Sequence, residues 1–387
     1  MDQPITLDAG AAAIALGVSR ATLYAYVSRH LIAATPDPVD PRRRRYAASD
    51  IARLQRTQAR GRKPQAIAAE TLDWGLPALP SRITMVEPTR LSYRGQDAAA
   101  LAGTAHLEAV ARLLWDCDGD DPFAAAAPAK LAPPDLPSLP RALAGLALAL
   151  PLSHPLPHRD PVRLHQDGAD LLRQMAGWLL GTTPARLPLH RQLAGAWKLQ
   201  RGAADLVRSA MVQLADHELN PSTFAVRVVA STGAALPACL AAGLAALSGP
   251  RHGGATPLAQ ALLSDAAAGD PATVVAQWLQ RGPIPAFGQP LYPTGDPRAA
   301  WLLARLPADP VRDAVIGAVD RISGVAPNID FALAALVRAL GLPDDAGFTI
   351  FALARSAGWI AHALEQHLDG RLIRPRAAYV GVRPASL

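Results

Sequence analysis

A cation stands beside the predicted start of a helix in the segment FGQPLYPTGDPR, residues 287–298. The prolines and glycines predict a rigid loop, and DPR then opens a helix with Asp296 as its N-cap and Pro297 in its first turn. Arg298 follows at once, and the backbone N–H groups of a helix N-terminus also favour anions. This loop therefore has the chemistry to hold a negatively charged small molecule. A neutral residue, Gln289, lies at its centre.

Three further segments place a histidine or an aspartate beside the start of a predicted helix: His217 in ADHELNPSTF, His252 in GPRHGGATPLAQ and Asp330 in APNIDFALAAL. Asn220 and Thr256 would cap the first two helices. Each segment alone is consistent with ordinary helix capping. The two glycines that follow His252 call for more than a cap, because they let backbone or a ligand approach closely.

Composition indicates a large globular protein. The chain has 387 residues, half of them hydrophobic, which favours two or three domains. Its two cysteines are far apart and have no CxxC partner, which excludes a disulfide scaffold or a zinc site and suits a reducing cytoplasm. There is no basic-then-apolar signal pattern, and apolar runs such as 142–150 are too short to span a bilayer. We expect a cytoplasmic protein without a membrane segment.

The positive charge is concentrated at the N-terminus. Residues 1–63, here called the head, hold eleven arginines or lysines against five aspartates, which accounts for the whole net charge of +6. Residues 64–387, here called the body, are neutral in balance. A basic head on a neutral body predicts two separate functions.

The head has the pattern of two helices, a basic loop and a further helix. In ITLDAGAAAIALGVSRATLYAYVSRHLI the first helix runs roughly over 7–16 and ends at Gly17, and Ser19 caps the second. Leu23 and Val27 then face the core. RRRRYAASDIARLQR supplies the basic loop and a helix capped near Ser49.

This arrangement resembles the winged helix-turn-helix of the MerR and excisionase-like families, in the pieces LGVSRATLYAY and RRRRYAASDIARL. The resemblance implies binding to duplex DNA, with the second helix in the major groove and the basic wing on phosphate. The residues implied are Arg20, Thr22, Tyr24, Arg42, Arg43, Arg44 and Arg45. A small helical appendage with a solvated arginine run remains the alternative.

The body is predicted to be mainly α. Residues 64–92 form a linker and entry segment, and most periodic stretches after it are helical, such as FTIFALARSAGWIAHALEQHL at 348–368. Strand signals are confined to short pieces near 83–86 and 91–94. Residues 122–160 are rich in proline and alanine and carry little signal.

Six separated segments of the body resemble the citrate synthase family: YRGQDAAALA with LEAVARLLWD, then ADHELNPSTFAVRVVAS, LSGPRHGGA, GDPRA, PNIDF and IRPRAAYVG. The resemblance implies a large helical domain (93–255 and 348–387), a small helical domain (256–347) and a homodimer with a shared active site. That family condenses acetyl-CoA with oxaloacetate in the tricarboxylic acid cycle. It implies no metal and no cofactor other than acetyl-CoA as co-substrate.

The same resemblance assigns roles to individual residues. Asp330 would remove a methyl proton beside the thioester, and a helix N-terminus would keep its carboxylate ionised. His252 would donate a hydrogen bond to the thioester oxygen. The carboxylates of oxaloacetate would be held by His217, Arg298, Arg355 and, from the other subunit, Arg374.

Gln289 departs from the family pattern, which has a ketone-polarising histidine nine residues before Arg298. Glutamine can donate a hydrogen bond but cannot transfer a proton near neutral pH. Losing one such donor typically costs about 3 kcal/mol, or ~10²–10³ in rate. Two hypotheses follow: a slowed or substrate-shifted citrate synthase-type enzyme, which we favour, or a metabolite sensor whose body controls DNA binding by the head.

Overall fold

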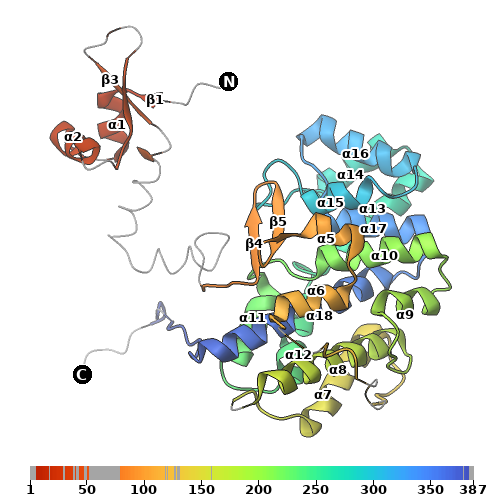
Figure 1. Ribbon diagram of the computed structural model, residues 1–387. Coiled ribbons are helices and arrows are strands. Elements are labelled where there is room, and N and C mark those ends of the chain that lie inside the picture. Colours follow the sequence, from red (N-terminus) through yellow and green to blue (C-terminus); the bar gives the residue numbers. More distant parts are fainter. Residues whose placement is uncertain are drawn as a thin grey trace. The chain divides into compact units, whose positions relative to one another are not determined.

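The computed structural model describes residues 6–16, 18–28, 31–37, 40, 43–47, 50–51, 79–117, 119, 121–125, 128, 131–157, 159–377 and 379–382. The chain divides into two compact units (Figure 1). One comprises Met1–Pro80 with Arg376–Leu387, and the other Ser81–Pro375. Each unit is described by itself.

The first unit packs two short helices, α1 (Ala9–Leu16) and α2 (Arg20–Ser28), with a small antiparallel sheet. Its strands are β1 (Thr6–Leu7), β2 (Ala34–Pro36) and β3 (Arg44–Ala47), in the order β1–β3–β2. Both helices were predicted, and Ser19 caps the second, its Oγ accepting a hydrogen bond from Thr22 N at 3.2 Å. Helix α1 begins later than predicted because Leu7 pairs with Tyr46 in the sheet.

A compact core holds this unit together. Leu23 is fully buried there, as predicted, among the following side chains: Ala12, Leu16, Ile32, Tyr46 and Ile51. Val27 packs against the same cluster. Gly17, the predicted helix end, and Ser49, the predicted cap of a further helix, lie outside the described residues, but Asp50 and Ile51, directly after that cap, are helical.

The second unit opens with three short strands and continues as helices. The strands are β4 (Thr84–Glu87), β5 (Arg90–Tyr93) and β6 (Gln96–Asp97), antiparallel in the order β4–β5–β6. The α-helices are α5 (Ala98–Thr104), α6 (Leu107–Trp115), α7 (Ser138–Ala149), α8 (Pro161–Leu180), α9 (Leu189–Ala196), α10 (Arg201–Leu214), α11 (Pro221–Ala230), α12 (Leu236–Leu247), α13 (Ala255–Ala268), α14 (Pro271–Arg281), α15 (Pro297–Leu303), α16 (Pro310–Ser323), α17 (Ile329–Leu340) and α18 (Ala346–Asp369), with a 3₁₀ turn, η1 (Leu150–Leu152).

This architecture confirms the prediction of a mainly helical body with short strands near 83–94. Helix α7 was missed in the segment rich in proline and alanine, although Ala142, Leu146 and Ala149 form its buried face. The division into a large and a small domain at 256–347 stays a prediction. Among the helices that the structure describes, none is both long and apolar enough to cross a membrane.

Helix α18 is the central element of the body (Figure 1). Almost all of its side chains are buried, and it packs against α6, α8, α10, α11 and α12. Its closest approach is at Gly358, whose backbone N–H donates to Ala215 O at 3.1 Å. A Cβ at Gly358 would lie 2.4 Å from both Ala215 O and Asp216 Oδ1. Only glycine therefore lets α18 lie against the end of α10.

Replacing Gly358 with alanine tests this contact. The added Cβ cannot be accommodated without moving backbone, so we expect the free energy of unfolding to fall by about 1–3 kcal/mol in chemical denaturation of the full chain. Gly103→Ala is the matched control, since a Cβ there meets nothing within 4 Å. Its helical position should be neutral or slightly stabilising. Equal stability of the two variants would contradict the close approach.

Candidate active site

The predicted helix starts converge in the body. His217 lies just before α11, His252 before α13, Arg298 in the first turn of α15 and Asp330 in the first turn of α17, while Arg355 comes from the middle of α18. Hydrogen bonds join these segments in pairs. The linking contacts are His217 to Tyr292, His252 to Ser222, Thr256 to Asp330, and Asp296 to Ile329.

Arg374 is not part of this convergence within one chain. It is exposed in the extended segment that follows α18. The predicted role for Arg374 requires a second subunit.

Asp296 fixes Arg298 as the loop sequence predicted. It caps α15 by accepting from Arg298 N, and it also accepts from Arg298 Nε at 2.9 Å and Nη2 at 2.7 Å. Ile329 N donates at 3.1 Å to Asp296 Oδ2, the oxygen that also accepts from Arg298 Nη2, which ties α15 to α17. Both ionic side chains are almost fully buried, and although burial acts to lower the pKa of Arg298, the charge and hydrogen bonds of Asp296 outweigh it and raise that pKa. The cation is therefore permanent and rigidly aimed.

Arg355 is a buried cation that forms no ion pair with any residue the structure describes. The residue is 1 % exposed, and its Nε donates to Leu214 O at 2.9 Å. Among the described residues no carboxylate lies within ion-pair distance of it. Burial lowers the pKa of Arg355, although it stays far above neutrality because guanidinium is a very weak acid. A buried charge of this kind is costly unless an anion pairs with it.

His217 is buried and neutral. Its pKa is held well below the usual value, first by burial and then by the charges of Arg298 and Arg355. Its Nε2 lies 3.1 Å from Tyr292 Oη, a contact that sequence reasoning missed. A neutral His217 can act by hydrogen bonding, and its predicted contact with a carboxylate of oxaloacetate stays a prediction.

His252 is neutral as well. Burial, with a contribution from Arg355, lowers its pKa to about 4. Its Nε2 lies 2.8 Å from Ser222 Oγ, in the first turn of α11. The glycines after it serve backbone packing, because a Cβ at Gly253 would lie 2.3 Å from Leu247 O.

Asp330 lies in the first turn of α17, as predicted, and its hydrogen-bond partner there is Thr256. Thr256 does not cap α13, whose N-cap is Gly254 without a side-chain hydrogen bond, and instead donates from Oγ1 to Asp330 Oδ1 at 2.7 Å. Burial raises the pKa of Asp330 despite its place at a helix N-terminus, because desolvation outweighs the threonine hydrogen bond and the nearby arginines. A raised pKa makes this carboxylate a stronger base once ionised.

Gln289 is anchored to its own loop. Its Oε1 accepts from Leu291 N at 3.4 Å, and Gly288 before it is bound on both sides, N to Ala326 O at 2.8 Å and O from Asn328 Nδ2 at 3.0 Å. These hydrogen bonds hold the loop backbone on both sides of Gly288. The acceptor side of the carboxamide is used within the loop.

The missed residues had signals in the sequence. Tyr292 lies inside the very loop that drew attention, three residues after Gln289, and is its only phenol. Thr256 was treated as a cap because Pro257 follows it, and a cap was the ordinary interpretation. Both errors concern which partner a polar side chain finds across the fold.

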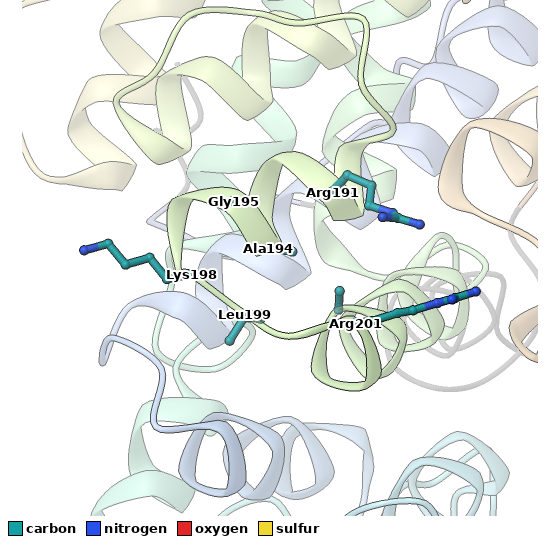
Figure 2. Close-up of a pocket in the computed structure, with 7 residues that line it drawn as sticks. Arg191, Ala194, Gly195, Lys198, Leu199 and Arg201 are labelled. Carbon is teal, nitrogen blue, oxygen red and sulfur yellow. The ribbon is translucent and has the colours of Figure 1, made fainter.

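A hollow of about 690 Å³ lies elsewhere in the body, between the end of α9 and the start of α10 (Figure 2). Its lining includes Arg191, Lys198 and Arg201. Figure 2 shows Lys198 pointing away from the side to which Arg191 and Arg201 point, so the three cations do not converge on one ligand. The hollow contains none of the residues that the sequence selected.

Comparison with known proteins gives a family for this arrangement. Residues 172–376 match the family model described as citrate synthase, C-terminal domain. The chain is 39 % identical over 191 residues to citrate synthase of Haloferax volcanii, covering 46 % of this chain and 50 % of that protein. It is 35 % identical over 191 residues to 2-methylcitrate synthase of Shewanella oneidensis, covering 45 % and 50 %. The matched part thus spans about half the length of these curated relatives.

The fold has solved counterparts. Citrate synthase of Thermoplasma acidophilum, crystallised as a ternary complex with carboxymethyl coenzyme A and oxaloacetate, is similar with a TM-score of 0.63. The similarity covers 81 % of this chain and 96 % of that one, at 21 % identity. At that identity the likeness shows the fold.

The depressed pKa of His252 predicts a pH effect on stability. Between pH 6.5 and about 4 His252 is protonated in the unfolded chain but stays neutral in the folded chain. The free energy of unfolding therefore falls as the pH falls through this window. His252→Gln should remove on the order of 1–3 kcal/mol of that loss, measured by denaturant unfolding at several pH values.

His106→Gln is the opposite-sign control for this experiment. Its hydrogen bond with Glu108 raises the pKa of His106, so its contribution is present at low pH and is lost as the pH rises. The variant should be more acid-sensitive than the wild type. If both variants shift acid sensitivity in the same direction, the neutral state of His252 is wrong.

Proposed function

The chain belongs to the citrate synthase family, and on that premise we propose that it is a transferase that condenses acetyl-CoA, or another short acyl-CoA, with oxaloacetate. The observation that carries this proposal is the buried pair of guanidinium groups. Arg298 is oriented by Asp296, and Arg355 has no carboxylate partner among the described residues. A dicarboxylate with a ketone between its ends suits two such fixed cations.

The proton-abstracting step is assigned to Asp330. Burial raises the pKa of Asp330 toward neutral pH, and a general base works best when its pKa lies near the working pH. Thr256 holds one oxygen, Oδ1, which leaves Oδ2 to take the methyl proton of the acyl-CoA. The proton moves from carbon to this oxygen as the C–H electron pair becomes the enolate.

The oxygen of that enolate is assigned to His252. Ser222 Oγ donates its one proton to Asn220 Oδ1 at 2.6 Å and accepts from Trp359 Nε1 at 3.2 Å, so His252 Nε2, at 2.8 Å, donates to it in the free site. If the hydroxyl proton turns from Asn220 to Nε2, the neutral imidazole carries its own proton on Nδ1 and can donate it to the thioester oxygen. A neutral donor avoids placing a third cation in the site.

A homodimer with a shared site is part of the same proposal. After α18 the chain is extended, and Leu372, still in the second unit, is 59 % exposed; farther along the chain, in the first unit, Tyr379 is 70 % and Val380 96 % exposed. Apolar groups exposed in such a segment are typical of an arm that packs on a second subunit. Arg374 lies on this arm and would complete the partner's site. Neither cysteine forms a disulfide, which agrees with a place in the cytoplasm.

The metabolite-sensing regulator remains the second candidate, supported by the head. Tyr24 on α2 is 53 % exposed, and Arg43 and Arg44 are exposed beside β2. Arg43 pairs with Asp40 at 3.4 Å, however, and Arg45 with Asp37 at 2.8 Å. Two of the wing arginines therefore already have local carboxylates. The side chain of Arg20, and Arg42, lie outside what the structure describes.

The enzymatic proposal is tested by CoA release from acetyl-CoA and oxaloacetate on the purified full chain. We expect turnover in the wild type and a loss of about 10²–10⁴ in Asp330→Asn, because the general base is removed. Asp320→Asn makes the same chemical change on the exposed face of α16 and should leave the rate unchanged. Unimpaired release by Asp330→Asn would contradict the assignment. Oxaloacetate binding without CoA release would favour the sensor.

DNA binding by the head is tested with a short random-sequence duplex and the full-length protein. Affinity should fall steeply with salt, because each phosphate contact releases counterions. Arg44→Ala should weaken binding to all sequences and reduce the salt slope by about one. Arg90→Ala, an exposed arginine of the body paired with Glu87, should change neither. Binding that does not depend on salt, or equal effects of the two variants, would end this proposal.

A further inference from the structure

Tyr292 places a phenol at the centre of the candidate site. Its side chain is 1 % exposed, and its Oη lies 3.1 Å from Nε2 of His217. The guanidinium of Arg298 lies over its ring, 5.5 Å from the centroid. The imidazole therefore holds the hydroxyl, and the cation assigned to a substrate carboxylate lies over the ring.

Its neighbours determine which way the phenolic proton can go. His217 is neutral, so only one of its ring nitrogens carries a proton. In the Nε2–H tautomer His217 donates to Tyr292 Oη, and the phenolic proton is left for a ligand. Burial also raises the pKa of Tyr292 to about 12, so the hydroxyl is protonated at neutral pH and able to donate.

Gln289 lacks these advantages. Its carboxamide oxygen accepts from Leu291 N of its own loop, which leaves the NH₂ group to donate a hydrogen bond, but an amide N–H cannot be transferred as a proton near neutral pH. Gln289 and Tyr292 belong to one hydrogen-bonded turn, since Tyr292 N donates to Gln289 O at 2.9 Å. The same rigid turn therefore carries both candidate donors, and one of them is a phenol held by His217.

We propose that Tyr292 is the catalytic residue that donates to the ketone oxygen of the bound keto acid, in the role that Gln289 cannot fill. This inference rests on the proposed condensation. As the enolate carbon bonds to the ketone carbon, the C=O electron pair moves onto oxygen. The Tyr292 O–H bond then breaks and its proton passes to that oxygen. The phenolate is stabilised by His217 Nε2–H and by Arg298, and it regains a proton from solvent when product leaves.

A donor at Tyr292 changes the expected effect of Gln289 on the rate. With Tyr292 as donor, the wild type need not be slow, and Gln289→His alone should change the rate by less than about tenfold because the donor is already present. Tyr292→Phe should lower CoA release by about 10²–10³. Its oxaloacetate affinity should change by less than about tenfold, because Arg298 and Arg355 remain. Gln289→His in the Tyr292→Phe background should restore part of the lost rate, which a merely structural role for the phenol would not allow.

A readout without turnover separates the proposal from the proposed function. The carbon-13 signal of oxaloacetate labelled at the ketone should move downfield on binding to the wild type, because a strong donor polarises the carbonyl. Tyr292→Phe should abolish most of that shift, whereas Gln289→Leu should keep it. Loss of the shift in Gln289→Leu but not in Tyr292→Phe would overturn the proposal. If Tyr292→Phe does not fold, Gln289→Leu alone still decides, since it loses the shift only when glutamine is the donor.

The same experiment distinguishes failure of the proposed condensation from failure of the proposed role of Tyr292. Wild-type protein that does not bind labelled oxaloacetate contradicts the proposed function, and the Tyr292 role falls with it. Wild-type protein that binds oxaloacetate and shows a shift insensitive to Tyr292→Phe contradicts the Tyr292 role alone. Binding with a Tyr292-dependent shift but no CoA release supports Tyr292 as the ketone donor in a site whose condensation fails at another step.

Discussion

The contact between α18 and the end of α10 is the constraint on which the site depends. Gly358 brings the helix so close that its N–H bonds to Ala215 O, one turn away from the point where Arg355 Nε donates to Leu214 O. His217 lies two residues after Ala215 in the chain. The close approach of α18 to the end of α10 therefore fixes both Arg355 and His217. Without it, the guanidinium of Arg355 would have no backbone anchor in the core. A substitution that fills this gap would disturb binding and stability together.

A buried polar network lies beside the contact between α18 and the end of α10 and stabilises it. His362 Nε2 lies 3.3 Å from Asp216 Oδ2, and Arg227 Nε donates to His362 Nδ1 at 3.2 Å. Arg227 also pairs with Glu365. Interactions with His362 and Arg355 lower the pKa of Asp216 although burial opposes the shift, so the carboxylate stays ionised. Buried charges that are paired and hydrogen-bonded in this way specify one arrangement of the surrounding helices.

Burial and nearby charges give the residues of the site different protonation states. The arginines remain charged in a buried place and suit anions, while burial and those same arginines keep His217 and His252 neutral. Burial has the opposite effect on Asp330, whose pKa rises. One environment therefore yields fixed cations, neutral donors and a strengthened base. Residue types alone could not give these protonation states, since each depends on desolvation by distant segments.

Local rules predicted what lies within a few residues of sequence. Asn220 and Asp296 cap their helices as expected, because cap and helix are contiguous. The prediction for Thr256 was wrong because its hydroxyl finds Asp330, 74 residues away in sequence. Tyr292 was missed for the same reason, since its partner His217 belongs to another segment. The family motifs located the site, and the partners across the fold decided its chemistry.

The most direct test of this account is a crystal structure of the full chain with oxaloacetate and an unreactive acyl-CoA analogue. The account predicts that Arg298 and Arg355 each bind a carboxylate of the same oxaloacetate molecule. The ketone oxygen would lie within hydrogen-bond distance of Tyr292 Oη, and the analogue's methyl-equivalent group would face Asp330. Oxaloacetate bound away from both arginines, or with its ketone directed at the Gln289 amide and away from Tyr292, would contradict it.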